Sequence, residues 1–249
     1  MRSLIYPAPP VAVGAPPADF EEVTLELDDG VRVVAWHRQP AAGSSHPAMV
    51  FFHGNGENLE TMTAAGLYAR LRQLEAPLLV VDYPGYGRSG GRPDETALKR
   101  AADRAGVWML QRYPERGLVP CGWSLGAALA LHVAAESRIG VAGVVAISPW
   151  TRLADVANLH FPAFLVDLGL REDYDSLTLA RRIEAPALVV HGARDGIIPA
   201  AQGERIAAAL RQSRWVPLAE AGHNDLLAVP RVWQEIERFL DTLVGAEAL

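Results

Sequence analysis

Short apolar runs alternate with longer helical patterns along most of this chain, and this alternation limits the possible folds more than any other feature. The apolar runs lie at residues 48–52, 78–81, 119–121, 141–147, 187–190 and 214–218. Patterns typical of helices lie between most of these runs or after the last one, at residues 59–74, 95–113, 125–136, 200–210 and 231–244. Runs that are apolar on both faces are typical of parallel strands buried between two helical layers. The alternation therefore predicts an α/β fold with right-handed crossovers and one doubly wound, mostly parallel sheet flanked by helices.

Two segments depart from this rhythm. Near the amino end, residues 23–27 and 31–37 alternate apolar and polar side chains around an Asp-Asp-Gly turn, which predicts an antiparallel hairpin. Residues 149–182 hold aromatic and acidic side chains, and we expect a short helical insertion there, a cap over the carboxyl edge of the sheet. A length of 249 residues suits an α/β domain, so we treat residues 1–249 as a single domain that includes this cap.

The composition narrows the classes of partner and compartment. Half of the residues are hydrophobic, and the net charge is −6 with no basic run to bind nucleic acid. The single cysteine, Cys121, cannot form an intrachain disulfide, which fits a reducing compartment. Prolines make residues 1–17 a poor signal peptide, and Pro120 and Gly122 interrupt the uncharged window at residues 117–135. We therefore expect a cytoplasmic protein without a transmembrane segment.

The sequence GWSLG at residues 122–126 matches the pattern G-x-S-x-G between a predicted strand and a predicted helix. A serine at such a sharp turn has a strained backbone and presents its hydroxyl at the end of the sheet. The helix that starts there favours negative charge, and the N–H of Leu125 points to where an oxyanion would develop. We predict that Ser124 is a nucleophile, although the pattern alone could also be a turn whose glycines permit close packing.

A serine hydroxyl needs a base to remove its proton, and His223 is the histidine in the best position. It lies in the sequence AGHND at residues 221–225, after the last predicted strand, and the expected chain order for this motif is nucleophile, acid, histidine. The alternative for His223 is a solvated loop histidine. Other histidines lie at a strand end, on a buried helix or early in the chain: His191, His132, His37 and His46.

The acid that orients this base should follow the preceding strand. Asp195 lies in the sequence HGARDG at residues 191–196, where its carboxylate would accept the imidazole N–H and stabilise the imidazolium. The alternative is an ordinary turn aspartate. Asp225 is too near His223 in sequence to be the natural partner. The aspartates of the insertion are weaker candidates: Asp155, Asp167 and Asp175.

The sequence HGNG at residues 53–56 follows an apolar run, and its glycines let a loop approach the substrate. We expect the N–H of Asn55 to join that of Leu125 in an oxyanion hole, although another amide of this loop could donate instead. The pocket wall is predicted from residues near these motifs: Gly54, Tyr86, Trp123, Trp150, His160 and Phe161. Their aromatic bulk suggests an apolar acyl or aryl group, but the same residues could belong to the core.

Five motifs in order give the chain a family resemblance. They read HGNGEN at 53–58, DYPGYGRSGG at 82–91, GWSLG at 122–126, HGARDGIIP at 191–199 and AGHNDL at 221–226. This set resembles the α/β-hydrolase superfamily, and more closely its branch of small, nearly lidless serine hydrolases that includes protein depalmitoylases. The resemblance implies an α/β-hydrolase fold and hydrolysis of a carboxylic ester or thioester. The chain lacks the cysteine-rich anchor of the depalmitoylases, so the resemblance does not extend to membrane attachment.

Other functions stay open at this point. A peptidase or an acyltransferase could use the same three residues, and a peptidase would need an acidic group such as Glu172 or Asp173 to hold an amine. A non-catalytic binding protein could keep the fold. The sequence GYGRSG at residues 85–90 matches a dinucleotide-binding pattern, but the following Arg-Pro delays the next helix. The histidines are scattered, so we expect no metal and no cofactor, and a small-molecule substrate as partner.

Overall fold

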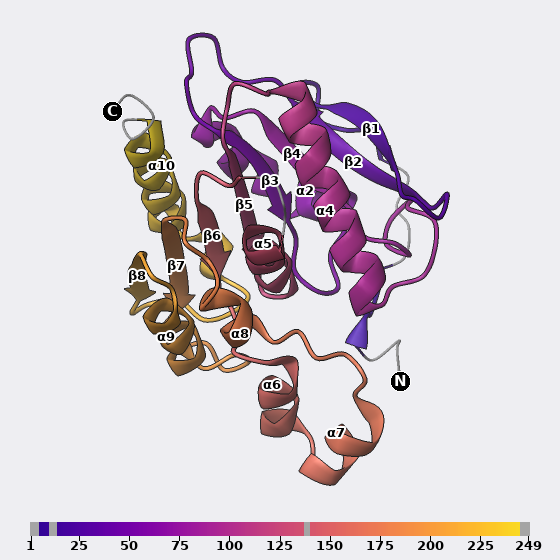
Figure 1. Ribbon diagram of the computed structural model, residues 1–249, viewed down its shortest axis with the longest axis vertical. Coiled ribbons are helices and arrows are strands. Elements are labelled where there is room, and N and C mark those ends of the chain that lie inside the picture. The colour runs from indigo at the N-terminus through magenta and orange to yellow at the C-terminus, as the bar shows by residue number, and fades with distance from the viewer. Residues whose placement is uncertain (1–4, 10–13, 137–139, 245–249) are drawn as a thin grey trace.

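The strands form one sheet in the computed structural model, which describes residues 5–9, 14–136 and 140–244. In this part of the chain, eight strands follow the order β1-β2-β4-β3-β5-β6-β7-β8. Their bounds are β1 Glu21–Glu26, β2 Arg32–Arg38, β3 Ala48–Phe52, β4 Leu78–Val81, β5 Leu118–Trp123, β6 Val144–Ile147, β7 Ala187–Gly192 and β8 Ser213–Leu218. β1 and β2 form an antiparallel hairpin, β2 is antiparallel to β4, and the other pairs are parallel. The predicted mostly parallel sheet with an antiparallel hairpin is therefore confirmed (Figure 1).

Helices connect most of the strands. The described helices are α2 Leu59–Ala64, α3 Leu67–Leu71, α4 Glu95–Arg112, α5 Leu125–Glu136, α6 Leu153–His160, α7 Ala163–Gly169, α8 Ser176–Ala180, α9 Ala200–Ala209 and α10 Pro230–Val244, with 3-10 turns η1 Arg72–Leu74 and η2 Leu226–Ala228. Two predicted extents are wrong. The helix expected over 59–74 breaks at Gly66, whose φ of 71° is left-handed. The strand expected over 141–147 begins at Val144, because Val141 makes only an isolated bridge to Leu118.

The central strands of the sheet are buried on both faces because they send alternate side chains to two cores. In β3, Val50 and Phe52 belong to the core that includes α4, α5 and α9. Met49 and Phe51 belong to the core that includes α2, α3 and α10. All four side chains are at most 1% exposed. Burial of a side chain of this size stabilises a fold by roughly 1.5–3 kcal/mol, so the two-sided apolar runs hold the helices on both faces.

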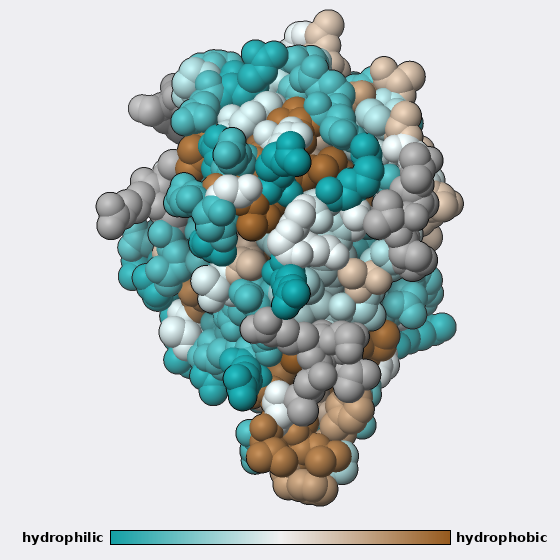
Figure 2. Space-filling model, turned by 90° about the vertical axis from the view of Figure 1, so that its right-hand side faces the viewer, coloured by the Kyte–Doolittle hydropathy of each residue, from teal (hydrophilic) through white to brown (hydrophobic). Residues whose placement is uncertain are grey.

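α6 and α7 form one end of the molecule, beyond the sheet (Figure 1). They and the turn between them expose large apolar side chains, which give the brown lower tip of Figure 2: Leu159, Phe161, Phe164, Leu165 and Leu168. Among the described residues, no helix combines the length and the apolar character needed to cross a membrane.

Candidate active site

β5 ends in a sharp turn that presents Ser124 at the carboxyl edge of the sheet. Ser124 has a φ of 57°, a left-handed conformation that costs a non-glycine residue of order 1–3 kcal/mol. A Cβ atom on Gly122 would lie 2.0 Å from the carbonyl oxygen of Gly126, and one on Gly126 would lie 2.0 Å from that of Phe52. The two glycines therefore let α5 start directly against β5 and β3. The Ser124 N–H donates to the Ile147 carbonyl at 2.9 Å, which holds the turn against β6.

His223 lies within hydrogen-bond distance of two residues from other loops, Ser124 and Asp195. The Nε2 atom of His223 is 3.1 Å from the Ser124 Oγ, and its Nδ1 atom is 2.7 Å from the Asp195 Oδ2. Ser124 follows β5, Asp195 follows β7 and His223 follows β8, so parallel strands bring them to the same edge of the sheet. Each of these residues is 7–8% exposed, which leaves the hydroxyl little contact with bulk water.

Donors fix both oxygens of the Asp195 carboxylate. Its Oδ1 accepts the N–H groups of Ile197 at 2.9 Å and Ile198 at 2.7 Å, while the Nε2 of His191 lies 3.3 Å from its Oδ2. Burial by itself raises the pKa of this carboxyl, but hydrogen bonds from His191, His223 and the Ile198 amide outweigh burial and hold the pKa below its usual range. An ionised carboxylate only accepts hydrogen bonds. The Nδ1 of His223 therefore carries a proton, and its Nε2 is left to accept the Ser124 hydroxyl.

The contact of His191 with this acid is a feature that the sequence did not indicate. His191 lies at the end of β7, as the sequence predicts, and its side chain is fully buried. Its Nε2 also lies 2.9 Å from the carbonyl oxygen of Ile198, which can only accept, so Nε2 is the protonated nitrogen. The same N–H faces Asp195 and stabilises its negative charge.

The alternative bases and acids lie outside this cluster. Three further histidines pair with acidic residues away from this cluster: His132 with Asp103, His37 with Glu21, and His46 with Asp241. Asp155 accepts the Thr151 hydroxyl, and Asp175 caps α8 and pairs with Arg152. In the described part of the chain, no group of three or more His, Cys, Asp and Glu side chains is placed to hold a metal ion.

Two backbone amides have no acceptor within the described residues: that of Leu125, the residue after Ser124, and that of Asn55, in the loop after β3. The Leu125 N–H belongs to the first turn of α5, where donors lack helical partners. The neighbouring Gly54 N–H, by contrast, donates to the Glu57 Oε2 at 3.1 Å. Of the loop amides at Gly54 and Asn55, the one at Asn55 is therefore free to bind a ligand atom.

The Asn55 side chain makes hydrogen bonds that hold this loop in place, so its polar atoms are already occupied. Its Oδ1 accepts the Tyr86 hydroxyl at 2.8 Å, and its Nδ2 donates to the carbonyl oxygen of Ile5. The next residue, Tyr6, is 3% exposed, and its hydroxyl lies 2.9 Å from that of Tyr174. Residues near the amino end thus support the loop after β3, and no pattern in the Pro-rich start of the sequence predicts this.

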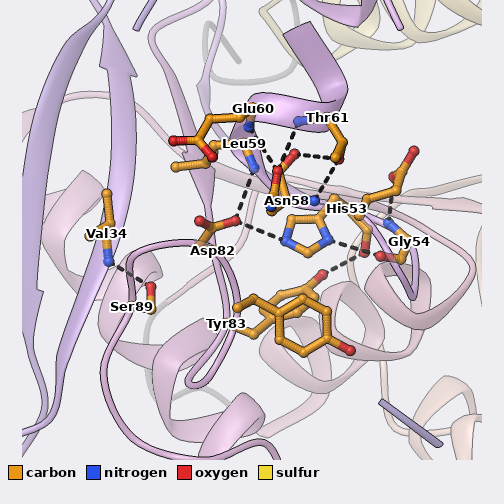
Figure 3. Close-up of polar contacts among 12 residues, drawn as sticks. Val34, His53, Gly54, Asn58, Leu59, Glu60, Thr61, Asp82, Tyr83 and Ser89 are labelled. Carbon is orange, nitrogen blue, oxygen red and sulfur yellow. Dashed lines mark hydrogen bonds and ion pairs between the residues drawn. The ribbon is translucent and has the colours of Figure 1, made fainter. Parts of the chain in front are cut away.

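A buried polar network lies on the other side of the same loop (Figure 3). The His53 Nδ1 is 2.9 Å from the Gly54 carbonyl oxygen, and its Nε2 is 3.4 Å from the Asp82 Oδ1. The Tyr83 hydroxyl donates to the His53 carbonyl at 2.6 Å, and the Leu59 N–H donates to the Asp82 Oδ1 at 3.0 Å. The side chains of His53 and Asp82 are 0% and 4% exposed, so this network belongs to the protein interior.

Glu57 is an acidic residue of this loop that sequence reasoning missed. Burial raises the pKa of its carboxyl. The nearby His53, a hydrogen bond from the Gly54 amide and His223 each lower that pKa by a smaller amount. The residue is part of the HGNGEN motif, which is the one signal in the sequence that could have singled it out.

Three of the predicted pocket residues gather around the loop and the imidazole. The Trp123 ring lies with its centre 5.2 Å from that of the His223 ring. Gly54 packs against the same indole, since a Cβ atom there would lie 2.5 Å from it. Tyr86 is fully buried and reaches the loop through its hydroxyl bond to Asn55.

The other predicted pocket residues lie further along the chain, on or near α6. Trp150 is 5% exposed and donates its indole N–H to the Tyr174 carbonyl at 3.3 Å. His160 is exposed, and its Nε2 lies 3.0 Å from the carbonyl oxygen of Ile197 in the loop that carries the acid. Phe161 is 58% exposed, so its ring lies largely in solvent rather than in a closed pocket.

The glycine-rich stretch at residues 85–90 is a turn fastened to β2. The Val34 N–H donates to the Ser89 Oγ at 2.9 Å (Figure 3), and the Gly90 N–H donates to the Arg32 carbonyl at 2.8 Å. α4 begins only at Glu95, after these glycines. The stretch therefore does not open a helix as a dinucleotide-binding turn does.

Known proteins resemble this chain in sequence and in fold. A family model for the alpha/beta hydrolase fold matches residues 47–167. An uncharacterized protein of Mycobacterium tuberculosis (strain ATCC 25618 / H37Rv) is 34% identical over 250 residues, which cover 96% of this chain and 86% of that protein. The lysophosphatidylserine lipase ABHD12 of Danio rerio is 24% identical over 223 residues, 76% of this chain and 58% of that protein. The solved esterase Pf2001 of Pyrococcus furiosus has a TM-score of 0.76 at 18% identity, covering 96% of this chain and 100% of that one.

These matches agree with the structure. The matched range 47–167 contains β3, β4, β5 and the Ser124 turn, and the relative with 34% identity extends over nearly the whole chain. The mostly parallel sheet and the strand-to-helix turn at Ser124 agree with the α/β-hydrolase fold that the five sequence motifs imply. The chain therefore belongs to the α/β-hydrolase family.

Proposed function

We propose that this protein is a serine hydrolase that cleaves a carboxylic ester or thioester with Ser124, His223 and Asp195 as its catalytic triad. The observation that carries the proposal is the unbroken contact from Asp195 Oδ2 to His223 Nδ1 at 2.7 Å and from His223 Nε2 to Ser124 Oγ at 3.1 Å. Nucleophile, base and orienting acid need this order of contacts. Relatives described as an esterase and as a lysophosphatidylserine lipase support ester cleavage.

In the first step, Ser124 forms the acyl-enzyme. The Ser124 Oγ attacks the substrate carbonyl carbon while its proton moves to the His223 Nε2. The tetrahedral intermediate then breaks its bond to the alkoxide or thiolate, and His223 gives the proton to that leaving group. Asp195 accepts from Nδ1 throughout and stabilises the imidazolium.

In the second step, water takes the place of the leaving group. His223 removes a proton from the water, whose oxygen bonds to the acyl carbon. The bond between this carbon and the Ser124 Oγ then breaks, and His223 returns the proton to the serine. The acid is released, and the enzyme is in its starting state.

The carbonyl oxygen becomes negative in both steps, and the N–H groups of Leu125 and Asn55 are the donors that would stabilise it. Both lack an acceptor within the described residues, so they are free to bind the oxyanion. Removal of one such donor typically lowers the rate by about 10²–10³-fold.

The two acidic residues named for a peptidase, Glu172 and Asp173, give little support to that alternative. A peptidase of the kind considered above needs a free carboxylate to hold an amine. Asp173 lies 3.2 Å from the Arg152 guanidinium, and Glu172 is 9% exposed. Asp173 therefore already has a cationic partner, and Glu172 has little exposed surface to offer an incoming amine.

The test is covalent labelling with a fluorophosphonate probe, together with initial rates on p-nitrophenyl esters of short and long acyl chains. The variants are Ser124→Ala, His223→Ala and, as a matched control, Ser45→Ala at an exposed serine in the loop before β3. We expect wild type and the control to label and hydrolyse, and the two triad variants to do neither.

Labelling of Ser124→Ala at the wild-type rate would assign the nucleophile elsewhere. Failure of correctly folded wild type to label and to hydrolyse any ester would refute the proposal and favour a binding protein on this fold. If wild type does hydrolyse esters, its preference among acyl chain lengths narrows the substrate class.

A further inference from the structure

The peptide group between Gly54 and Asn55 carries both the carbonyl that His53 contacts and the N–H assigned to the oxyanion. A peptide group is planar and trans, so its C=O and its N–H point in opposite directions. Any group that fixes the direction of the Gly54 carbonyl therefore fixes the direction of the Asn55 N–H. A hydrogen-bond donor to the Gly54 carbonyl therefore sets the direction of the Asn55 N–H, the proposed oxyanion donor.

The His53 imidazole is that donor. Its Nδ1 lies 2.9 Å from the Gly54 carbonyl oxygen, which can only accept, so the proton is on Nδ1. On the other side of the same residue, the Gly54 N–H is held by the Glu57 Oε2 at 3.1 Å. Both polar backbone groups of Gly54 are thus fixed by side chains, whereas the N–H of Asn55 stays free within the described residues.

The ring itself is held in one orientation. Its Nε2 faces the Asp82 Oδ1 at 3.4 Å, an ion-pair distance longer than an ordinary hydrogen bond. Its plane lies against Tyr83, with ring centres 4.2 Å apart, and the Tyr83 hydroxyl holds the His53 carbonyl at 2.6 Å. Asp82 is fixed in turn by the Leu59 N–H at the start of α2. Figure 3 shows these side chains converging on the imidazole from separate segments.

The pair lies in the protein interior, with the side chain of His53 at 0% and that of Asp82 at 4% exposure. The His53 Nε2 has no hydrogen-bond partner among the described residues, so its 3.4 Å approach to Asp82 is a polar contact rather than a hydrogen bond. Buried polar groups are costly without a partner, which favours this orientation of the ring toward Asp82.

We propose that His53 is a positioning residue which, held by Asp82, fixes the Gly54 carbonyl and so aims the Asn55 N–H at the oxyanion. The inference rests on the proposed function, because it assumes an acyl-transfer oxyanion at this place. It assigns a task to a second His–Asp pair, separate from His223 and Asp195, that touches neither the substrate nor Ser124.

Two substitutions at His53 separate its two contacts. The amide nitrogen of Asn can take the place of Nδ1, so His53→Asn keeps a donor to the Gly54 carbonyl and loses the contact with Asp82. The amide of the longer Gln can take the place of Nε2, so His53→Gln keeps a polar contact with Asp82 and loses the donor to Gly54. His46→Gln serves as the control, because His46 binds the Leu74 carbonyl and Asp241 instead.

The measurements are kcat and KM on a p-nitrophenyl ester, with active sites counted by fluorophosphonate titration so that unfolded molecules do not enter kcat. We expect His53→Gln to lower kcat by a factor approaching the 10²–10³-fold cost, to order of magnitude, of losing one oxyanion donor. KM should change less than about threefold, since the donor acts mainly on the transition state. His53→Asn should stay within about tenfold of wild type, and His46→Gln should match wild type.

Asp82→Asn reaches the same loop without altering His53 and serves if His53→Gln yields no folded protein. Its amide oxygen can still accept the Leu59 N–H, but the charge facing Nε2 is gone, and we expect kcat to fall about tenfold at unchanged KM. Equal kcat for wild type, His53→Gln and Asp82→Asn would overturn the inference, as would equal losses in His53→Gln and His53→Asn. These kcat outcomes do not bear on the proposed function itself. The proposed function fails if Ser124→Ala still labels with the fluorophosphonate.

Discussion

Replacement of Asp195 with Asn tests the assigned base most directly, because it keeps the shape of the side chain and inverts one hydrogen bond. The N–H groups of Ile197 and Ile198 lie 2.9 and 2.7 Å from Oδ1, and they will keep the amide oxygen on that side. The amide nitrogen then faces His223 in place of Oδ2. A donor there makes the His223 Nδ1 an acceptor, so the ring proton moves to Nε2. A protonated Nε2 cannot remove the proton from Ser124.

The expected loss follows from this tautomer. Where an orienting aspartate in a serine triad is changed to asparagine with the geometry intact, kcat falls by about 10⁴-fold. At 1.36 kcal/mol for each factor of ten, this is about 5 kcal/mol of transition-state stabilisation. KM should change little, since Asp195 is buried between His191, His223 and two backbone amides.

The assay is hydrolysis of p-nitrophenyl butyrate, together with the second-order rate constant for fluorophosphonate labelling. The matched control is Asp225→Asn, in the same loop as His223. Asp225 Oδ1 accepts the Gly222 N–H at 2.7 Å, and an amide oxygen can do the same, so kcat should stay within about tenfold of wild type. Activity of Asp195→Asn within tenfold of wild type would refute the tautomer argument, and an equal loss in both variants would assign the effect to the loop instead.

Two further predictions concern stability. The pKa of Asp195 is lowered in the folded protein from its ordinary value of 3.8, so its contribution to stability is present above that pH and is lost as the pH falls below it. The urea midpoint of wild type should therefore fall more steeply than that of Asp195→Asn between about pH 5 and pH 3; parallel curves would contradict this. Gly126→Ala should lower the free energy of unfolding by about 1–3 kcal/mol, because the new Cβ would lie 2.0 Å from the Phe52 carbonyl oxygen. Gly140→Ala, with nothing within 4 Å of its Cβ, should change it by less than about 1 kcal/mol in the same urea titration, and equal effects would refute the steric argument.

The sheet is predictable from the sequence because its signal is local. A strand such as β3, with Met49 and Phe51 in one core and Val50 and Phe52 in the other, is apolar at every position within a short window. Helix boundaries are less predictable. The break at Gly66 falls between segments that both favour a helix, and only the turn geometry shows that they are two helices.

The candidate site is predictable only in part. Ser124, Asp195 and His223 were expected together because each follows a strand and parallel strands end at one edge. The contact between Tyr6 and Tyr174 joins residues 168 positions apart, and no period relates them. The contact of His53 with Asp82 depends in the same way on how two loops pack, which local patterns do not encode.

The chain order of the site residues has a consequence during translation. The proposed nucleophile Ser124 precedes the proposed base His223 by 99 residues, and β7 and β8, which precede Asp195 and His223, complete one edge of the sheet. At about 5–20 residues per second, a ribosome needs about 5–20 s to add these 99 residues. If the proposed triad is right, the nascent polypeptide holds its serine without a base for that time, and we expect no ester hydrolysis from it. Cleavage of a fluorogenic ester during cell-free synthesis would report that the chain has grown past His223 and folded.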